Sequence, residues 1–193
     1  QISVDELLSN EKSEKKQSDY IYESRTEYDI DGKKNFDIKL GGAYAVDLKA
    51  YHGEKIEVAM FSNVYKNLLA DYKVKIDDIK NRIDIDLNRF NEASEADAKE
   101  SLVITIFIPV KYIGKIELSV NARTLNITDI ENEHIEVNGK ISEVTLQGNK
   151  SEIEIDSNLD MQISVLSHEG AIEINQLSAT SRLTIPADYR FRS

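Results

Sequence analysis

The sequence predicts an all-β protein, a right-handed two-sided β-solenoid whose coils are about 19 residues long. Two observations lead to this prediction. Apolar–polar–apolar triplets, which are typical of strands with one buried face, recur roughly every ten residues. The polar residue at the centre of each triplet also alternates in kind along the second half of the chain, so the true repeat contains two strands.

The two classes of triplet differ in their central residue. In the first class this residue is a glutamate: Glu117, Glu136, Glu154 and Glu173. In the second class it is small and polar: Thr105, Asn126, Thr145, Ser164 and Thr184. An antiparallel meander gives no reason for this alternation, whereas each sheet of a two-sided solenoid keeps its own outward residue. Residues about 19 apart are then expected to stack roughly 4.8 Å apart.

The predicted handedness follows from the rule that parallel crossovers are almost always right-handed. We expect residues 1–19 to form a polar linker or short helix, because Ser3 and Glu6 make a capping-box pattern.

The rest of the chain is expected to form one continuous domain, residues 20–193. Within it, residues 20–100 form a less regular β region that caps or extends the coils, and residues 101–193 form the regular solenoid. Inside the first of these regions, the polar stretch from Asn88 to Ser101 has no β pattern and is predicted to be a surface loop containing about one helical turn.

Composition excludes several classes of function. The formal net charge is −11, which disfavours binding to nucleic acid or directly to anionic lipid. The chain has no cysteine, so thiol catalysis and cysteine-based zinc sites are excluded. No apolar run reaches the ~18 residues that a membrane-spanning helix needs, so any membrane anchor is expected upstream of Gln1.

The four glutamates of the first class are the main candidate for a binding site. Stacked carboxylates would repel one another by about 1 kcal/mol per pair in water, and a line of them could hold cations or a basic polymer. The alternative is a solvated face with Lys115 and Lys140 as counter-charges. The second column, with Asn126, Thr145 and Ser164, could bind a glycan or a strand edge, or could satisfy its own hydrogen bonds.

Other polar residues give weaker patterns. Asp29, Asp31 and Gly32 fit a turn better than a calcium loop, since position five would be lysine. The histidines His52, His134 and His168 are isolated, which is unlike a zinc site. We therefore expect no metal, no cofactor and no catalytic residues.

Several stretches resemble a known family. They are Leu102–Pro109, the repeats Lys115–Val120 and Leu125–Ile127, and a second strand–proline motif at Leu183–Pro186. Together they resemble the bacterial "putative adhesin" domains of unknown function, over roughly residues 36–185. The resemblance implies a single-stranded right-handed β-helix-like fold in the cell envelope, and it supplies no catalytic residues.

The functional prediction is a non-catalytic module of the cell envelope that binds or scaffolds at the surface, with its partner an unknown surface polymer or protein. It would lie outside the cytoplasm, at the cell surface or behind an anchor. One alternative is a membrane-anchored sensor of envelope stress. A second alternative is a polysaccharide-active β-helix enzyme, because parallel β-helices also host lyases and hydrolases. The oligomeric state is left open.

Overall fold

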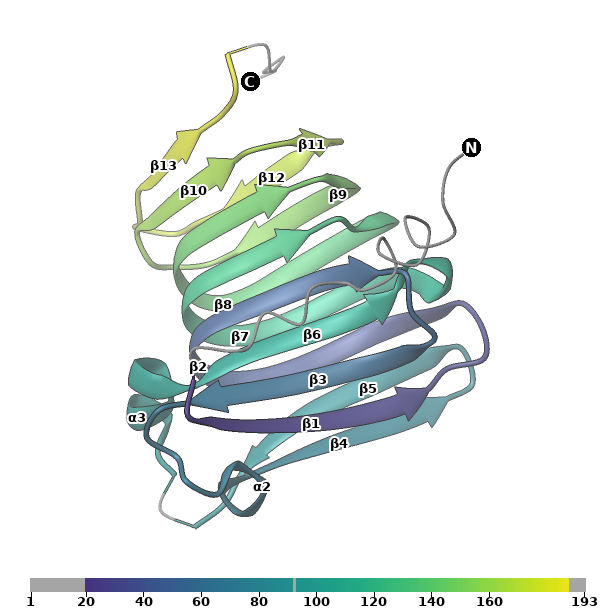
Figure 1. Cartoon of the computed structure of the whole chain (residues 1–193). Coiled ribbons are helices and arrows are strands. Elements are labelled where there is room, and N and C mark those ends of the chain that lie inside the picture. Colours follow the sequence, from purple (N-terminus) through teal and green to yellow (C-terminus); the bar gives the residue numbers. More distant parts are fainter. Residues whose placement is uncertain (1–19, 92, 188–193) are drawn as a thin grey trace, which may run out of the picture.

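The computed structural model describes residues 20–91 and 93–187 (Figure 1). This part of the chain is all-β, as predicted, with thirteen strands joined in one sheet. Residues 1–19, expected to be a linker or helix, lie outside the described residues. No helix in the described ranges is long and apolar enough to cross a membrane.

The second half of the chain is the most regular. Its strands are β7 (Ile113–Thr128), β8 (Glu131–Gln147), β9 (Asn149–Asp156), β10 (Met161–Val165), β11 (His168–Glu169), β12 (Ile172–Asn175) and β13 (Ser181–Thr184). β7 and β8 are long enough to hold one triplet of each class. The later layers are divided into separate strands, which follow one another toward the C-terminal end in Figure 1.

Parallel pairing aligns the triplets of each class. Glu117 lies opposite Glu136, Glu136 opposite Glu154, and Glu154 opposite Glu173. In the second class, residue 126 pairs with 145, 145 with 164 and 164 with 184. β8 thus contacts β9 through its first half and β10 through its second half. Neighbours across the strands are 18 to 20 residues apart in sequence.

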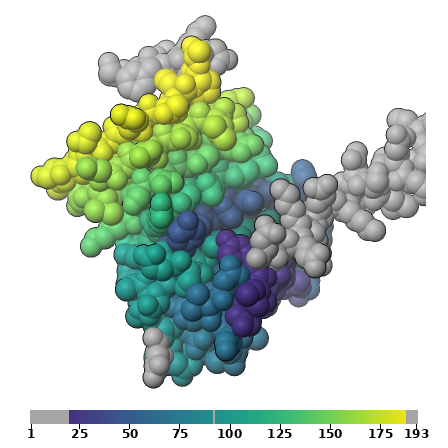
Figure 2. Space-filling view, turned by 60° about the vertical axis from the view of Figure 1, so that its left-hand side comes forward, coloured from purple at the N-terminus to yellow at the C-terminus, as the bar shows by residue number. Residues whose placement is uncertain are grey.

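The first half of the chain is interleaved with this arrangement. β2 (Lys34–Tyr51) lies between β6 (Val103–Pro109) and β7, and it is parallel to both. Its two triplets are aligned with those of β7, so Asp37 lies opposite Glu117 and Asp47 opposite Asn126. Figure 2 shows the consequence: the late segments form successive bands, whereas blue and teal segments are mixed in the lower part. The periodicity of the sequence does not predict this interleaving.

Antiparallel strands complete the N-terminal side of the sheet. β3 (Lys55–Ser62) pairs with β6 on one edge and with β1 (Tyr22–Asp29) on the other. β5 (Arg82–Arg89) is parallel to β2, and β4 (Tyr72–Ile79) is antiparallel to β5.

Short helical segments connect these strands. They are α2 (Leu68–Asp71), α3 (Glu95–Ser101) and the 3-10 turn η1 (Val110–Tyr112). α3 occupies the second half of the stretch from Asn88 to Ser101, which was predicted to be a loop with about one helical turn, and β5 extends into its start as far as Arg89. The Ser94 hydroxyl oxygen caps this helix by accepting a hydrogen bond from the Asp97 backbone N–H at 3.0 Å.

The core consists of the inward residues of the triplets. Ile135, Val137 and Ile155 are fully buried, and Ile153 is 1% exposed. Burial of each such side chain stabilises the folded state by about 1.5–3 kcal/mol, and much of this gain is offset by the loss of chain entropy. Burial decreases at the last layer, where Ile172 is only half-buried because β12 has one paired neighbour, β9.

Candidate functional site

The four glutamates of the predicted binding site lie side by side on the outward face of β7, β8, β9 and β12. Each stands between two inward aliphatic residues, and the two-residue period of a strand therefore turns its carboxylate to solvent. Because the strands pair in register, neighbouring glutamates are one strand spacing apart, about 4.8 Å.

The structure extends this line with three aspartates. Asp37 lies opposite Glu117, Asp84 opposite Asp37, and Asp77 opposite Asp84. We call the whole set the acidic row, and its members in spatial order are Asp77, Asp84, Asp37, Glu117, Glu136, Glu154 and Glu173. It crosses seven neighbouring strands, from β4 to β12.

The aspartate half of the row is neutralised by its own strands. The Lys39 ammonium lies 2.8 Å from the Asp37 carboxylate, and this hydrogen bond raises the pKa of Lys39. Arg82 Nε lies 2.6 Å from Asp84 Oδ1. Lys75 contacts Asp77 in the same way. In each case the cation is two residues from the aspartate, so both side chains point to the same face.

The glutamate half has no such compensation. Within the described residues, no lysine or arginine forms a salt bridge with Glu117, Glu136, Glu154 or Glu173. The expected counter-charges lie elsewhere: Lys115 pairs with Glu133 at 3.1 Å, and Lys140 forms no salt bridge with any described residue.

Amide groups contact two of these glutamates instead. Asn138 Nδ2 donates to Glu136 Oε1 at 2.7 Å. Asn175 Nδ2 donates to Glu154 Oε1 at 2.9 Å, and His134 Nε2 lies 3.8 Å from the other oxygen of Glu154. The amides orient the carboxylates and, being neutral, supply no counter-charge.

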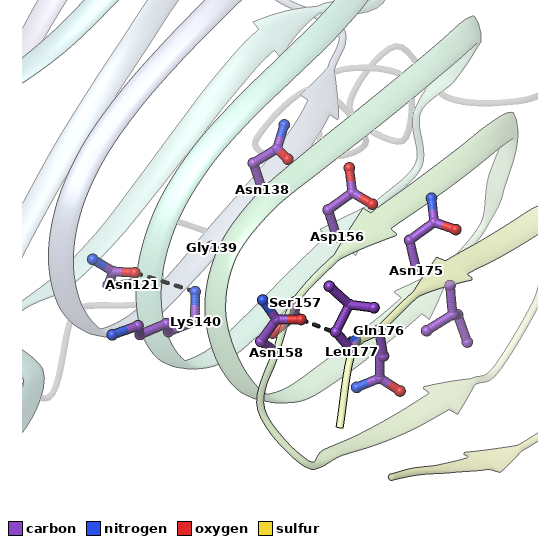
Figure 3. Close-up of a pocket in the computed structure, with 11 residues that line it drawn as sticks. Asn121, Asn138, Gly139, Lys140, Asp156, Ser157, Asn158, Asn175, Gln176 and Leu177 are labelled. Atoms are coloured by element: carbon purple, nitrogen blue, oxygen red, sulfur yellow. Dashed lines mark hydrogen bonds between the residues drawn. The ribbon is translucent and has the colours of Figure 1, made fainter. Parts of the chain in front are cut away.

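A groove lies directly beside the glutamate half, where the strands turn away from this face (Figure 3). Its volume is about 740 Å³. Asn138, Asp156 and Asn175 stand in a line along it, each two residues beyond a glutamate of the row. We call this feature the corner groove. Asparagine and aspartate at the ends of strands are usual turn residues, so the sequence alone does not single out these three.

Hydrogen bonds between layers shape the corner groove. The Asn121 side-chain oxygen accepts from the Lys140 backbone N–H at 3.1 Å. A similar bond further along the stack joins the Leu177 backbone N–H to the Asn158 side-chain oxygen at 3.0 Å. Both are drawn in Figure 3. They fix the turns to one another, so the groove is a built feature of the stack and not a gap between loops.

Comparison with known proteins adds information about the fold. No protein-family model matches the sequence, and no curated protein matches it either. One solved structure has a TM-score of 0.54 at 7% identity and covers 84% of this chain and 99% of its own. The chain is similar in fold to a putative cell adhesion protein from Clostridium sporogenes ATCC 15579.

Two further solved structures have related names. They are a putative adhesin from Parabacteroides merdae ATCC 43184 and one from Bacteroides fragilis NCTC 9343. Each is 11% identical to this chain; their TM-scores are 0.30 and 0.31. They cover 84% and 85% of this chain, and 96% and 97% of their own lengths. The resemblance to adhesin-named bacterial proteins, inferred from the sequence, is confirmed at the level of the fold by the protein from Clostridium sporogenes.

The second polar column is partly satisfied from within. Asn126 Nδ2 donates to Asp47 Oδ1 at 2.7 Å, and the Thr105 hydroxyl lies 3.4 Å from the other oxygen of Asp47. Around Asn126, these bonds favour the hypothesis that the second polar column satisfies its own hydrogen bonds. Thr145 and Ser164 continue the line across β8 and β10.

The remaining candidates do not converge. Asp29 ends β1, and Asp31 lies within the turn between β1 and β2. The described residues contain no group of three or more potential metal ligands. His52 follows β2, whereas His134 belongs to β8. His168, on β11, lies opposite Asn149, and burial lowers its pKa.

Proposed function

We propose that this protein is a non-catalytic, adhesin-like surface module of the bacterial envelope, located outside the cytoplasm, and that its acidic row holds a cationic surface polymer. The observation that supports the proposal is the uncompensated glutamate half of the row. The name of the structurally similar protein from Clostridium sporogenes agrees with a role at the cell surface.

A polymer is the partner that suits this geometry. The carboxylates repeat along a line at one strand spacing, so a linear chain of cations can contact several of them at once. Each exposed ion pair contributes only up to about 1 kcal/mol. Useful affinity therefore requires several simultaneous contacts, which multivalency along the row would provide.

We propose a non-catalytic role because of the way the carboxylates are arranged. Glycoside hydrolases place two carboxyl groups on opposite sides of the scissile bond. Here the glutamates lie beside one another on a single strand face, and the Asn138 and Asn175 amides bind two of them. A ligand lying along this face would meet its carboxylates from one side only.

We propose also that the strands wind as a right-handed two-sided β-solenoid. The support is the parallel pairing of β7, β8 and the later strands in two separate columns, combined with the strong preference of parallel crossovers for the right-handed form. In such a coil each polar column belongs to its own sheet, which explains why the two classes of triplet differ.

The test is binding of poly-lysine by the purified protein, measured at low and high salt. We expect the double variant Glu136→Gln/Glu154→Gln to bind about tenfold more weakly at low salt, since two contacts are lost. The control is Glu100→Gln/Glu143→Gln, which removes the same charge from exposed positions outside the row. An equal loss in both variants would show that net charge, and not the row, determines binding.

A further inference from the structure

The corner groove has the position of a ligand subsite. It is an open hollow of about 740 Å³ on the protein surface. It runs alongside the uncompensated glutamates, so a polymer lying on the row would have its side groups over the groove. The role of the groove as a subsite therefore rests on the function proposed for the row.

The polar groups of the corner groove retain hydrogen-bonding capacity. Asn138 and Asn175 each use one amide hydrogen on a glutamate, which leaves the second hydrogen and the carbonyl oxygen of each amide. Between them, the Asp156 carboxylate makes no side-chain hydrogen bond to any described residue. Figure 3 shows these three side chains in one line. An amide, a carboxylate and a second amide thus follow one another at one strand spacing, and this series of donors and acceptors suits the hydroxyl groups of a sugar chain.

The corner groove also has a small apolar part. Ile174 lines it in a half-buried position, and Leu177 is 76% exposed. None of the described lining residues is aromatic. A planar aromatic ligand would therefore find no stacking partner there. A methyl group beside a polar amide, as in an acetamide, would find both an apolar contact and a hydrogen-bond partner.

From these three features we infer that the polymer is a partly N-acetylated aminoglycan. Its free amines would lie on Glu136, Glu154 and Glu173, and its hydroxyl and acetamide groups would enter the corner groove. The glutamates of the row supply charge for the amines, while the groove side chains Asn138, Asp156, Asn175 and Leu177 distinguish a sugar from any other polycation.

The experiment compares three ligands: a glucosamine hexasaccharide, a half-acetylated hexasaccharide of the same length, and poly-lysine. We expect the native protein to bind the half-acetylated sugar about fivefold more tightly than the fully deacetylated one. Leu177→Ser and, separately, Asp156→Asn should abolish that preference while changing poly-lysine binding by less than about twofold. Asp31→Asn, which alters a side chain that is 93% exposed outside the groove, is the control for Asp156→Asn.

Two results would overturn the inference: equal or tighter binding of the deacetylated sugar by the native protein, or an unchanged preference in both groove variants. A failure of the row itself gives a different result, because poly-lysine binding would then be insensitive to Glu136→Gln/Glu154→Gln. The two proposals can therefore fail independently.

Discussion

Replacing Glu136 by glutamine should stabilise the folded protein, because it removes a negative charge from the middle of the uncompensated half of the acidic row. Glu136 has a glutamate on each side, Glu117 on β7 and Glu154 on β9. The substitution keeps the size of the side chain. It also keeps the oxygen that accepts the 2.7 Å hydrogen bond from Asn138, so little contact is lost.

The expected magnitude follows from the spacing of the strands. Two unit charges about 5 Å apart in water repel each other by about 0.8 kcal/mol, and Glu136 has two such neighbours. Side chains that spread apart reduce this repulsion, and the loss of a charge-assisted hydrogen bond offsets part of the gain. We therefore expect a net stabilisation of about 0.5–1 kcal/mol at low salt, which falls toward zero at about 1 M salt.

The assay is urea denaturation near neutral pH at low and high salt, with the free energy of unfolding obtained by linear extrapolation. The matched control is Asp84→Asn. Asp84 also has an acidic residue on each side, but it pairs with Arg82 at 2.6 Å, so its neutralisation should not stabilise the protein. A gain that does not depend on salt, or an equal gain in both variants, would refute the electrostatic reasoning.

Three further expectations concern the fold. Ile153→Ala should lower the free energy of unfolding, measured by urea denaturation, by about 2–5 kcal/mol, because this side chain is buried. Ile172→Ala should lower it distinctly less, because Ile172, the neighbour of Ile153 in the last layer, is only half-buried. Equal losses in the two variants would contradict this. Gly139→Ala should destabilise by several kcal/mol or prevent folding, because φ is +147° and a Cβ would lie 1.8 Å from the Val120 carbonyl oxygen; a native thermal midpoint would contradict this. Burial lowers the pKa of His168 below its ordinary value, so the unfolded chain takes up the proton first and stability should fall as the pH drops below about 6.5. His168→Gln should remove that part of the pH dependence, and an identical pH profile would contradict it.

The glutamates of the acidic row could be predicted from the sequence, and its aspartates could not. From β7 onward the repeat is uninterrupted, so an offset of 18 or 19 residues along the chain identifies the neighbours of Glu136. Asp37 becomes a neighbour of Glu117 only because β2 inserts beside β7, 80 residues away in sequence. Local periodicity contains no information on that pairing, even though Asp37 and Asp84 stand at the centres of ordinary apolar–polar–apolar triplets.

The corner groove could not be predicted from the sequence for a different reason. Asn138, Asp156 and Asn175 recur with the same offset as the glutamates, so the sequence does contain a signal. Asparagine, aspartate and glycine at strand ends are also the usual residues of turns, and that interpretation requires no further function. Only the stacking of three turns, joined by bonds such as that from the Leu177 backbone N–H to the Asn158 side chain, makes them one surface.

The alignment of Glu136 with Glu154 can be tested by disulfide formation, since the chain has no cysteine of its own. Glu136→Cys/Glu154→Cys should oxidise rapidly to an intramolecular disulfide, because the two positions are directly paired and one strand spacing lies within the reach of such a bond. Glu136→Cys/Thr145→Cys, although closer in sequence, should remain reduced as the monomer. If the second pair forms the bond and the first does not, the layered register is wrong, and the acidic row and the corner groove do not exist as described.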